Sequence, residues 1–207
     1  MRGRFITFEG GEGVGKSTQT ERTAAWLRES GREVVVTREP GGTPRAERLR
    51  ELLLERSAEP MPPVCELMLM FAARATHVAN LIEPALARGA WVLCDRFTDA
   101  THAYQGGGRG LTAQQIDALA ALAHPSLAPD LTVLLDAPVA VGLARAGARR
   151  GSTPDRFEAE RREFFDRVRN AYLERARLEP RRIRIVDATG TVDDVQRAVR
   201  SALAQLV

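Results

Sequence analysis

One segment near the start of the chain limits its possible folds more than any other. Residues 10–17 read Gly-Gly-Glu-Gly-Val-Gly-Lys-Ser and match the whole pattern G-x-x-x-x-G-K-[ST]. The apolar and β-branched run 4–9 before it predicts a buried strand, and residues 18–29 after it predict a helix that ends near Gly31. Strand, glycine-rich turn and helix in this order predict a phosphate-binding loop rather than a chance glycine-rich turn.

The basic residues support this interpretation. Lys16 is the only lysine in the chain, and the other 29 of its 30 basic side chains are arginine. A coding bias toward arginine explains that composition, but it does not explain why the one lysine falls in this loop. A compact ammonium group fits between the loop and terminal phosphate oxygens better than a planar guanidinium does. The sequence therefore predicts a nucleoside triphosphate site.

Further strand-like runs alternate with helical patterns along the chain. The strand-like runs are residues 33–37, 91–94, 131–135 and 182–186, and the helical patterns are 65–88, 112–123, 139–146, 156–178 and 192–206. This alternation predicts one α/β domain over residues 1–207, with a parallel sheet covered by helices and ligands at the carboxyl ends of its strands. Runs rich in glycine, proline or arginine at 39–42, 105–110 and 149–155 predict turns or loops.

The net charge and the cysteine content limit the partners and the cellular location that we expect for this chain. The net charge is +3 and acids are interleaved with arginines, so we expect no nucleic-acid partner. Cys65 and Cys94 lie in apolar stretches and predict reduced core residues of an intracellular protein. The chain enters a strand at once and no apolar run reaches bilayer length, so we expect no signal peptide, no membrane partner and a cytoplasmic location.

A second group of candidate residues follows the strand-like run 91–94. Asp95 closes that run, where phosphate-loop enzymes hold Mg²⁺ opposite a hydroxyl such as that of Ser17. The alternative is that Asp95 caps the next helix. Glu9 is either a further partner of the metal site or an acid satisfied within the protein. Arg96 can clamp a phosphate and offset charge on a transferring group.

Several peptides together resemble the bacterial thymidylate kinase family. They are Thr-Arg-Glu-Pro-Gly-Gly-Thr at 37–43, Asp-Arg-Phe at 95–97 and Ala-Tyr-Gln-Gly-Gly-Gly-Arg-Gly at 103–110, and the likeness extends from residue 4 to residue 189. The resemblance implies transfer of the γ-phosphoryl group of ATP to dTMP, with Mg²⁺. It also implies a P-loop NTPase fold of five parallel strands with helices on both faces, a lid segment and, as is usual in the family, a homodimer.

The resemblance also assigns site residues. Lys16, Arg96, Glu12, Arg149 and Arg150 are the candidate catalytic residues. The implied ATP site comprises Gly10, Gly11, Glu12, Gly13, Val14, Gly15, Lys16, Ser17, Thr18 and Arg145. The implied dTMP site comprises Glu12, Arg38, Glu39, Pro40, Arg50, Met70, Phe71, Arg74, Arg96, Thr101, Tyr104 and Gln105. The implied metal site comprises Ser17, Asp95 and Glu9.

Individual roles follow from the same resemblance. Arg50 is expected to hold the dTMP phosphate, Arg74 to donate to a thymine carbonyl, and Tyr104 to crowd the 2′ position of the sugar. Without the resemblance, Arg50 would be interpreted as part of one charged helix face. Arg145 is expected either to stack on adenine or to be an exposed helix residue.

Two departures from the family pattern leave choices open. The family usually has an aromatic residue four positions before the base-binding arginine, but here that position is Met70, and Phe71 lies one residue later. Both share a face with Arg74, and we favour Phe71 as the cover of the thymine ring. The loop also lacks an arginine at Gly13, so Arg149 or Arg150 of a lid at about 147–156 is expected to act instead.

Two other functions compete with this interpretation. Another nucleoside monophosphate or deoxynucleoside kinase would share the loop and lid and differ in the acceptor pocket. A GTP-dependent switch finds support in the D-x-x-G match at 187–190. It would also need a guanine-reading N-K-x-D segment, which a chain with no second lysine cannot contain.

Overall fold

Five parallel strands form the centre of the computed structural model, which describes residues 2–148, 156–157 and 159–206. They are β1 (Phe5–Glu9), β2 (Val34–Arg38), β3 (Trp91–Asp95), β4 (Leu131–Asp136) and β5 (Ile183–Asp187). The order across the sheet is β2-β3-β1-β4-β5. Each predicted strand is confirmed to within one residue at either end, and the α/β fold class is confirmed with them.

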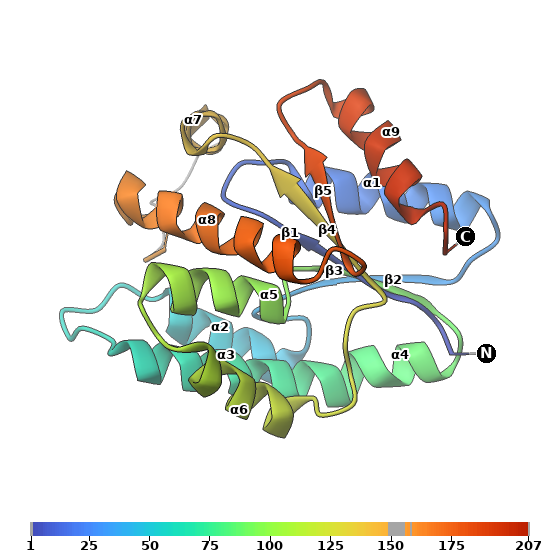
Figure 1. The fold of residues 1–207 in the computed structure, drawn as a ribbon. Coiled ribbons are helices and arrows are strands. Elements are labelled where there is room, and N and C mark those ends of the chain that lie inside the picture. Colours follow the sequence, from blue (N-terminus) through green and yellow to red (C-terminus); the bar gives the residue numbers. More distant parts are fainter. Residues whose placement is uncertain (1, 149–155, 158, 207) are drawn as a thin grey trace.

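Helices cover both faces of this sheet (Figure 1). On one face α1 (Lys16–Glu29) and α9 (Val192–Leu203) pack against Ile6 and Phe8 of β1. On the other face Phe5 of β1 packs against the π-helical segment η1 (Val78–Ile82) and α4 (Glu83–Ala87). α8 (Arg162–Leu178) covers β4 and β5 on that second face. Successive side chains of a strand point to opposite faces, so the apolar run of β1 belongs to two cores.

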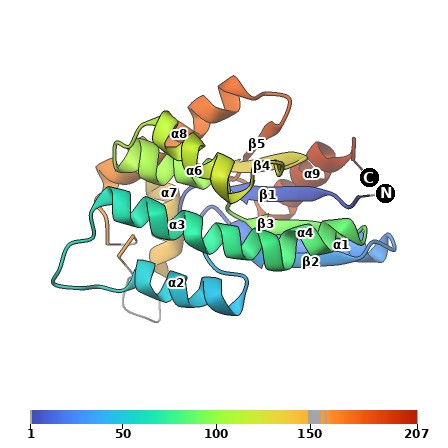
Figure 2. The ribbon, with the colours of Figure 1, turned by 90° about the horizontal axis from the view of Figure 1, so that it is seen from below.

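The remaining helices complete the second face and the rim, as Figure 2 shows from below. They are α2 (Pro44–Leu54), α3 (Pro63–His77), α5 (Thr98–Thr101), the π-helical η2 (His102–Gly108), α6 (Ala113–Ala123) and α7 (Val139–Ala148). The predicted helix 65–88 is one helical path from α3 through η1 to α4. The predicted helix 156–178 was too long, because regular helix begins only at Arg162. None of the helices within the described ranges is long and apolar enough to cross a bilayer.

The glycine-rich run 105–110 is not the turn or loop that the sequence predicted. Its first four residues are helical, as part of η2. A Cβ atom on Gly107 would lie 2.6 Å from the Cβ of Ala171, and one on Gly108 would lie 2.4 Å from the ring of Phe164. These two glycines therefore permit close packing of η2 against α8, rather than a flexible turn.

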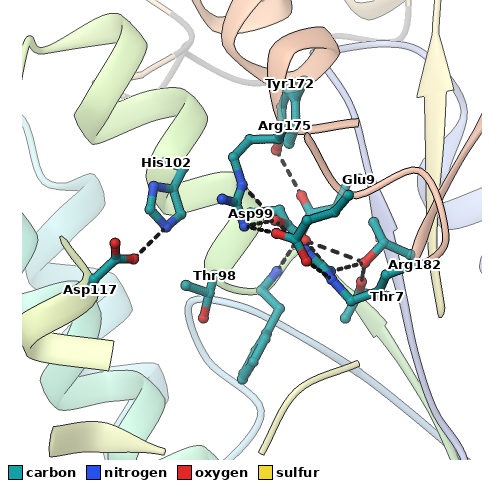
Figure 3. Close-up of polar contacts among 12 residues, drawn as sticks. Thr7, Glu9, Thr98, Asp99, His102, Asp117, Tyr172, Arg175 and Arg182 are labelled. Atoms are coloured by element: carbon teal, nitrogen blue, oxygen red, sulfur yellow. Dashed lines mark hydrogen bonds and ion pairs between the residues drawn. The ribbon is translucent and has the colours of Figure 1, made fainter. Parts of the chain in front are cut away.

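A buried carboxylate joins this helical layer to the sheet (Figure 3). Asp99 of α5 accepts hydrogen bonds from Arg182 at 2.6 and 2.9 Å and from Arg175 at 3.0 and 3.1 Å. Thr132 of β4 also donates to Asp99, and shares a 2.7 Å hydrogen bond with Thr7 of β1. Asp99 thus ties the segment that follows Arg96 to β1, β4 and the end of α8.

We expect Asp99→Ala to lower the free energy of unfolding by about 3–5 kcal/mol, because two guanidinium groups would lose their buried partner. Burial acts to raise the pKa of Asp99, but the hydrogen bonds and charge of Arg182, then Arg175, outweigh it and lower that pKa. The stabilisation is therefore present above the unfolded pKa of about 3.9 and disappears as the pH falls through the lower folded value. Urea unfolding at pH 7 and at acidic pH measures both effects.

The matched control is Asp117→Ala. Asp117 is an exposed acid of α6 that lies 3.2 Å from His102. Because the Asp117 side chain is largely exposed to solvent, its loss should cost about 1 kcal/mol or less. Equal losses in the two variants would contradict the stabilising role given to Asp99.

Candidate active site

A cavity of about 320 Å³ lies at the carboxyl ends of β1, β2 and β3. Most of the predicted site residues meet there: Glu12, Gly13, Gly15, Lys16, Ser17, Arg38, Glu39, Pro40, Arg50, Met70, Asp95, Arg96, Tyr104 and Gln105. Leu54, Ala100 and Phe157 also line it and were not predicted. The carboxyl ends of parallel strands lie at one edge of the sheet. The segments at the ends of β1, β2 and β3 therefore form a single site, although they are far apart in the sequence.

The phosphate-binding loop connects β1 to α1. Gly13 and Gly15 have φ angles of 69° and 95°, which lie in the left-handed region that glycine adopts without strain. A Cβ atom on Gly13 would lie 1.9 Å from the carbonyl oxygen of Gly142 in α7. Packing against α7 therefore excludes any side chain at position 13.

The ammonium group of Lys16 lies inside the loop. Its Nζ donates to the carbonyl oxygen of Gly11 at 2.7 Å and to that of Gly10 at 3.3 Å. Burial lowers the pKa of Lys16, and repulsion from Arg96 lowers it further. An anion bound in the loop would supply the opposite charge that this buried cation needs.

Ser17 and Asp95 form a pair of oxygen donors at the same edge. Ser17 Oγ donates to Asp95 Oδ2 at 3.2 Å, and Asp95 Oδ1 is buried with no hydrogen-bond partner in the described part of the chain. Asp95 does not cap α5, whose N-cap is Phe97. An unpaired carboxylate oxygen beside a hydroxyl fits Mg²⁺, which prefers oxygen ligands and retains water and phosphate ligands. Within the described ranges no cluster of three or more His, Cys, Asp or Glu side chains offers an alternative metal site.

Glu9 fits the second of its two predicted roles, an acid satisfied within the protein. Its carboxyl group is fully buried, and it accepts hydrogen bonds from Phe97 N and from the Tyr172 hydroxyl, both at 2.7 Å. Burial, and then repulsion from Asp99, raises the pKa of Glu9 to about 8. A carboxyl group that is protonated in much of the population at neutral pH is a poor ligand for a hard cation.

Arg96 lies at the centre of the polar wall of the cavity. Its Nη1 donates to Gly10 O at 3.0 Å and to the Tyr172 hydroxyl at 3.1 Å. Its Nη2 donates to Glu12 Oε1 at 2.6 Å and to the Tyr104 hydroxyl at 2.9 Å. Contacts from the loop, η2 and α8 therefore hold the guanidinium group in one orientation, as binding a phosphate in a defined position requires.

Two arginines lie on the acceptor side of the cavity. Arg38 pairs with Glu47 at 2.9 Å, and Arg50 Nη1 donates to the carbonyl oxygen of Pro40 at 2.9 Å. Arg50 is thus turned from α2 toward the 39–42 segment and lines the cavity, whereas a merely charged helix face would leave it in solvent. Its assignment to the dTMP phosphate stays a prediction.

Arg74 and Thr101 are almost fully buried behind Glu39, which lines the cavity. Arg74 Nε donates to Glu39 Oε2 at 2.6 Å, and its Nη2 donates to Thr101 Oγ1 at 3.0 Å. Arg74 Nη1 is buried without a partner among the described residues, and so is Oε1 of Gln105, one helical turn beyond Thr101. One unpaired donor and one unpaired acceptor therefore remain beside the cavity.

The packing does not support the preference for Phe71 over Met70. Met70 lines the cavity, whereas Phe71 lies in a core cluster with Leu67 and Ile116. The ring of Phe71 stacks near His124, with 6.4 Å between the ring centroids. The helix face that Met70 and Phe71 share with Arg74 could not distinguish them. Phe71 is covered because α6 packs against α3.

Other predicted residues lie off the cavity wall. Thr18 is exposed, and Val14 packs in the core beneath the loop. Arg145 donates to the carbonyl oxygens of Ala188 at 2.6 Å and Thr189 at 3.0 Å, so it is not a free surface side chain. Arg149 and Arg150 lie outside the described residues.

Sequence reasoning missed two residues at the end of the predicted lid. Phe157 lines the cavity, and Arg156 Nη1 lies 2.7 Å from the buried Glu66. An arginine followed by an aromatic residue at the end of the predicted lid was a signal that could have identified both residues.

A parallel sheet whose first strand enters such a loop, with an acid at the end of the neighbouring strand, defines a P-loop nucleotide-binding protein. The family model described as "Thymidylate kinase" matches residues 8–199. The chain therefore belongs to the thymidylate kinase family.

Individual relatives agree with this assignment. A thymidylate kinase of Pseudomonas syringae pv. syringae (strain B728a) is 59% identical over 207 residues, which is 100% of this chain and 98% of the relative. One from Chromohalobacter salexigens is 57% identical over 98% of this chain and 96% of the relative. The crystal structure of thymidylate kinase from Ehrlichia chaffeensis superimposes with a TM-score of 0.79 at 33% identity, covering 99% of both chains.

Proposed function

We propose that this chain transfers the γ-phosphoryl group of ATP to dTMP, which gives dTDP and ADP and supplies dTTP synthesis. Membership of the thymidylate kinase family makes the chain a phosphotransferase and favours an enzyme over a nucleotide-dependent switch. The aspartate of the D-x-x-G match also does not favour a switch. Asp187 accepts a hydrogen bond from the backbone N–H of Thr189 in its own loop, at 2.8 Å.

Family membership supports dTMP as the acceptor, and one observation about the site supports a base with the hydrogen-bonding edge that thymine and uracil share. Arg74 Nη1 is an unpaired donor and Gln105 Oε1 an unpaired acceptor, both buried beside the cavity. Thymine presents a carbonyl acceptor next to the N3–H donor, so its edge pairs with both groups. Burying either group without a partner costs about 1–3 kcal/mol, so a base with the complementary pattern is selected.

The other proposed roles follow from position in the cavity. The loop N–H groups and Lys16 bind the ATP phosphates, and Arg50 binds the phosphate of dTMP. Arg96, held between the loop and Tyr104, faces the phosphoryl group that moves between the two nucleotides. Ser17 and Asp95 would hold Mg²⁺, which offsets negative charge on the phosphates when bound. Met70 covers the thymine ring through its thioether.

Further properties of the family complete the proposal. The segment at about 147–156 acts as a lid, residues 1–207 form one domain, and the protein works as a homodimer in the cytoplasm. The family relationship supports these statements, and the position of Phe157 on the cavity wall, directly after this segment, supports the lid.

A coupled assay of ADP release tests the proposal. With ATP and Mg²⁺, we expect turnover of dTMP well above that of dCMP, dGMP or AMP, and loss of turnover when a chelator removes the metal. Higher activity with one of the other monophosphates would reassign the chain to another kinase of this class. Absence of any ATP consumption with dTMP would contradict the proposal.

A further inference from the structure

The side-chain amide of Gln105 has two different environments. Its Nε2 donates to Oε1 of Glu66 at 2.7 Å, whereas its Oε1 is buried with no partner in the part of the chain that the structure describes. Gln105 lines the cavity, and Glu66 lies on α3, behind it. The amide therefore offers an acceptor, and not a donor, as its unused group.

The charge of Glu66 determines this orientation. Glu66 is fully buried, and its carboxylate lies 3.3 Å from Nε of Arg109 and 2.7 Å from Nη1 of Arg156. These two guanidinium groups offset the negative charge of the buried carboxylate. An ionised carboxylate only accepts hydrogen bonds. Rotating the Gln105 amide by 180° would place two oxygen atoms in contact, so the amide cannot reverse.

We propose that Glu66 is a positioning residue that fixes the Gln105 amide with Oε1 as its free group and thereby selects a pyrimidine with an N3–H donor. The inference rests on the proposed function, because it assumes that Gln105 faces the base of the acceptor. Thymine and uracil both carry a hydrogen on N3, whereas N3 of cytosine is an acceptor. Cytosine would therefore bring a lone pair against Oε1 of Gln105, and the site would reject dCMP.

This proposal gives Glu66 a role beyond charge neutralisation. Arg109 has a second acidic partner, Glu160, at 2.6 Å, and Arg156 Nε donates to the carbonyl oxygen of Leu53 at 3.1 Å. Both arginines therefore retain a partner when Glu66 becomes neutral. Among the hydrogen bonds of the described residues, the Gln105 amide has no contact other than Glu66.

The test is Glu66→Gln, a neutral side chain of the same shape. A glutamine at position 66 can donate or accept, so the amide of Gln105 can turn either way and meet N3 of cytosine with a donor. We expect the ratio of kcat/KM for dTMP to that for dCMP to fall about tenfold to a hundredfold. The ratio of dTMP to dUMP should stay within about twofold, because both bases share the N3–H group.

Two further variants separate positioning from stability. Glu160→Gln weakens the same ion-pair cluster without touching Gln105, and it should leave the dTMP to dCMP ratio unchanged. The exchanged variant Glu66→Gln/Gln105→Glu restores an acceptor toward the base and should recover the preference for dTMP. It also keeps one carboxylate in the cluster, so it decides the question if Glu66→Gln alone does not fold.

The outcomes are distinct. Equal losses of activity with dTMP and dCMP in Glu66→Gln would overturn the inference and leave a structural role alone. A wild-type enzyme that does not phosphorylate dTMP would instead overturn the proposed function. Loss of discrimination in Glu66→Gln, with recovery in the exchanged variant, would support the inference.

Discussion

Replacing Lys16 by alanine should lower kcat for dTMP phosphorylation by about a thousandfold or more while the protein remains folded. The ammonium group lies in the loop, 2.7 Å from Gly11 O, and no second lysine exists in the chain to replace it. Negative charge that develops on the phosphoryl oxygens in the transition state would lose a buried cation of the loop. Burial already lowers the pKa of Lys16, so removing the charged group should not reduce stability.

Single-turnover kinetics and circular dichroism check this prediction together. Lys16→Arg keeps a positive charge but introduces a planar group that the loop cannot enclose, and it should recover little of the lost rate. The matched control is Arg22→Ala, which removes an exposed cation of the same helix α1 that pairs with Asp193. A kcat of Lys16→Ala within tenfold of that of the wild type would remove Lys16 from the reacting centre.

Replacing Arg96 by alanine should lower kcat by about a hundredfold to a thousandfold and weaken dTMP binding as well. The guanidinium group connects Gly10 of the loop to Glu12, Tyr104 and Tyr172, so it is oriented before substrates enter. Electrostatic stabilisation depends on such prior orientation, because the group need not be reorganised as charge develops. Glu12 would also lose a partner at 2.6 Å inside the cavity.

Measured kcat and KM for both substrates, with a dTMP titration by calorimetry, separate the two effects. Arg96→Lys should recover only part of the rate, because one ammonium group cannot maintain contacts in four directions. Arg88→Ala, which removes an exposed arginine paired with Glu33 in the turn before β3, serves as the control. Unchanged kcat in Arg96→Ala with raised KM for dTMP alone would limit Arg96 to acceptor binding.

The strands of this fold could be predicted from the sequence because each one is a local pattern. Runs such as 91–94 and 131–135 are apolar on both sides, and burial between two helical layers requires this of a central parallel strand. The prediction of a turn or loop at 105–110 was wrong because a local pattern does not show contacts between distant segments. Glycine signals a turn in an isolated segment, but here Gly107 and Gly108 permit contact with α8, more than fifty residues later.

Within the candidate site, the sequence was most informative where one peptide supplies the whole arrangement. The phosphate-binding loop, the acid that ends β3 and the arginine after it were predicted with their residues, and the structure brings them to one cavity. Residues that act through distant neighbours could not be found in this way. Glu66 accepts a hydrogen bond from Gln105 of η2, but in the sequence Glu66 looks like an ordinary acidic residue of a helix.

The sequence by itself determined the nucleotide-binding loop, the alternation of strands and helices, and the peptides that match the family, since each depends on residues a few positions apart. Only the tertiary structure decided that Met70 rather than Phe71 borders the cavity, that Glu9 is satisfied by Phe97 and Tyr172, and that Gln105 presents an oxygen. The physical reason is common to all three. Burial and hydrogen-bond partners are set by side chains that packing brings together from separate elements, and no local pattern specifies which of them will meet.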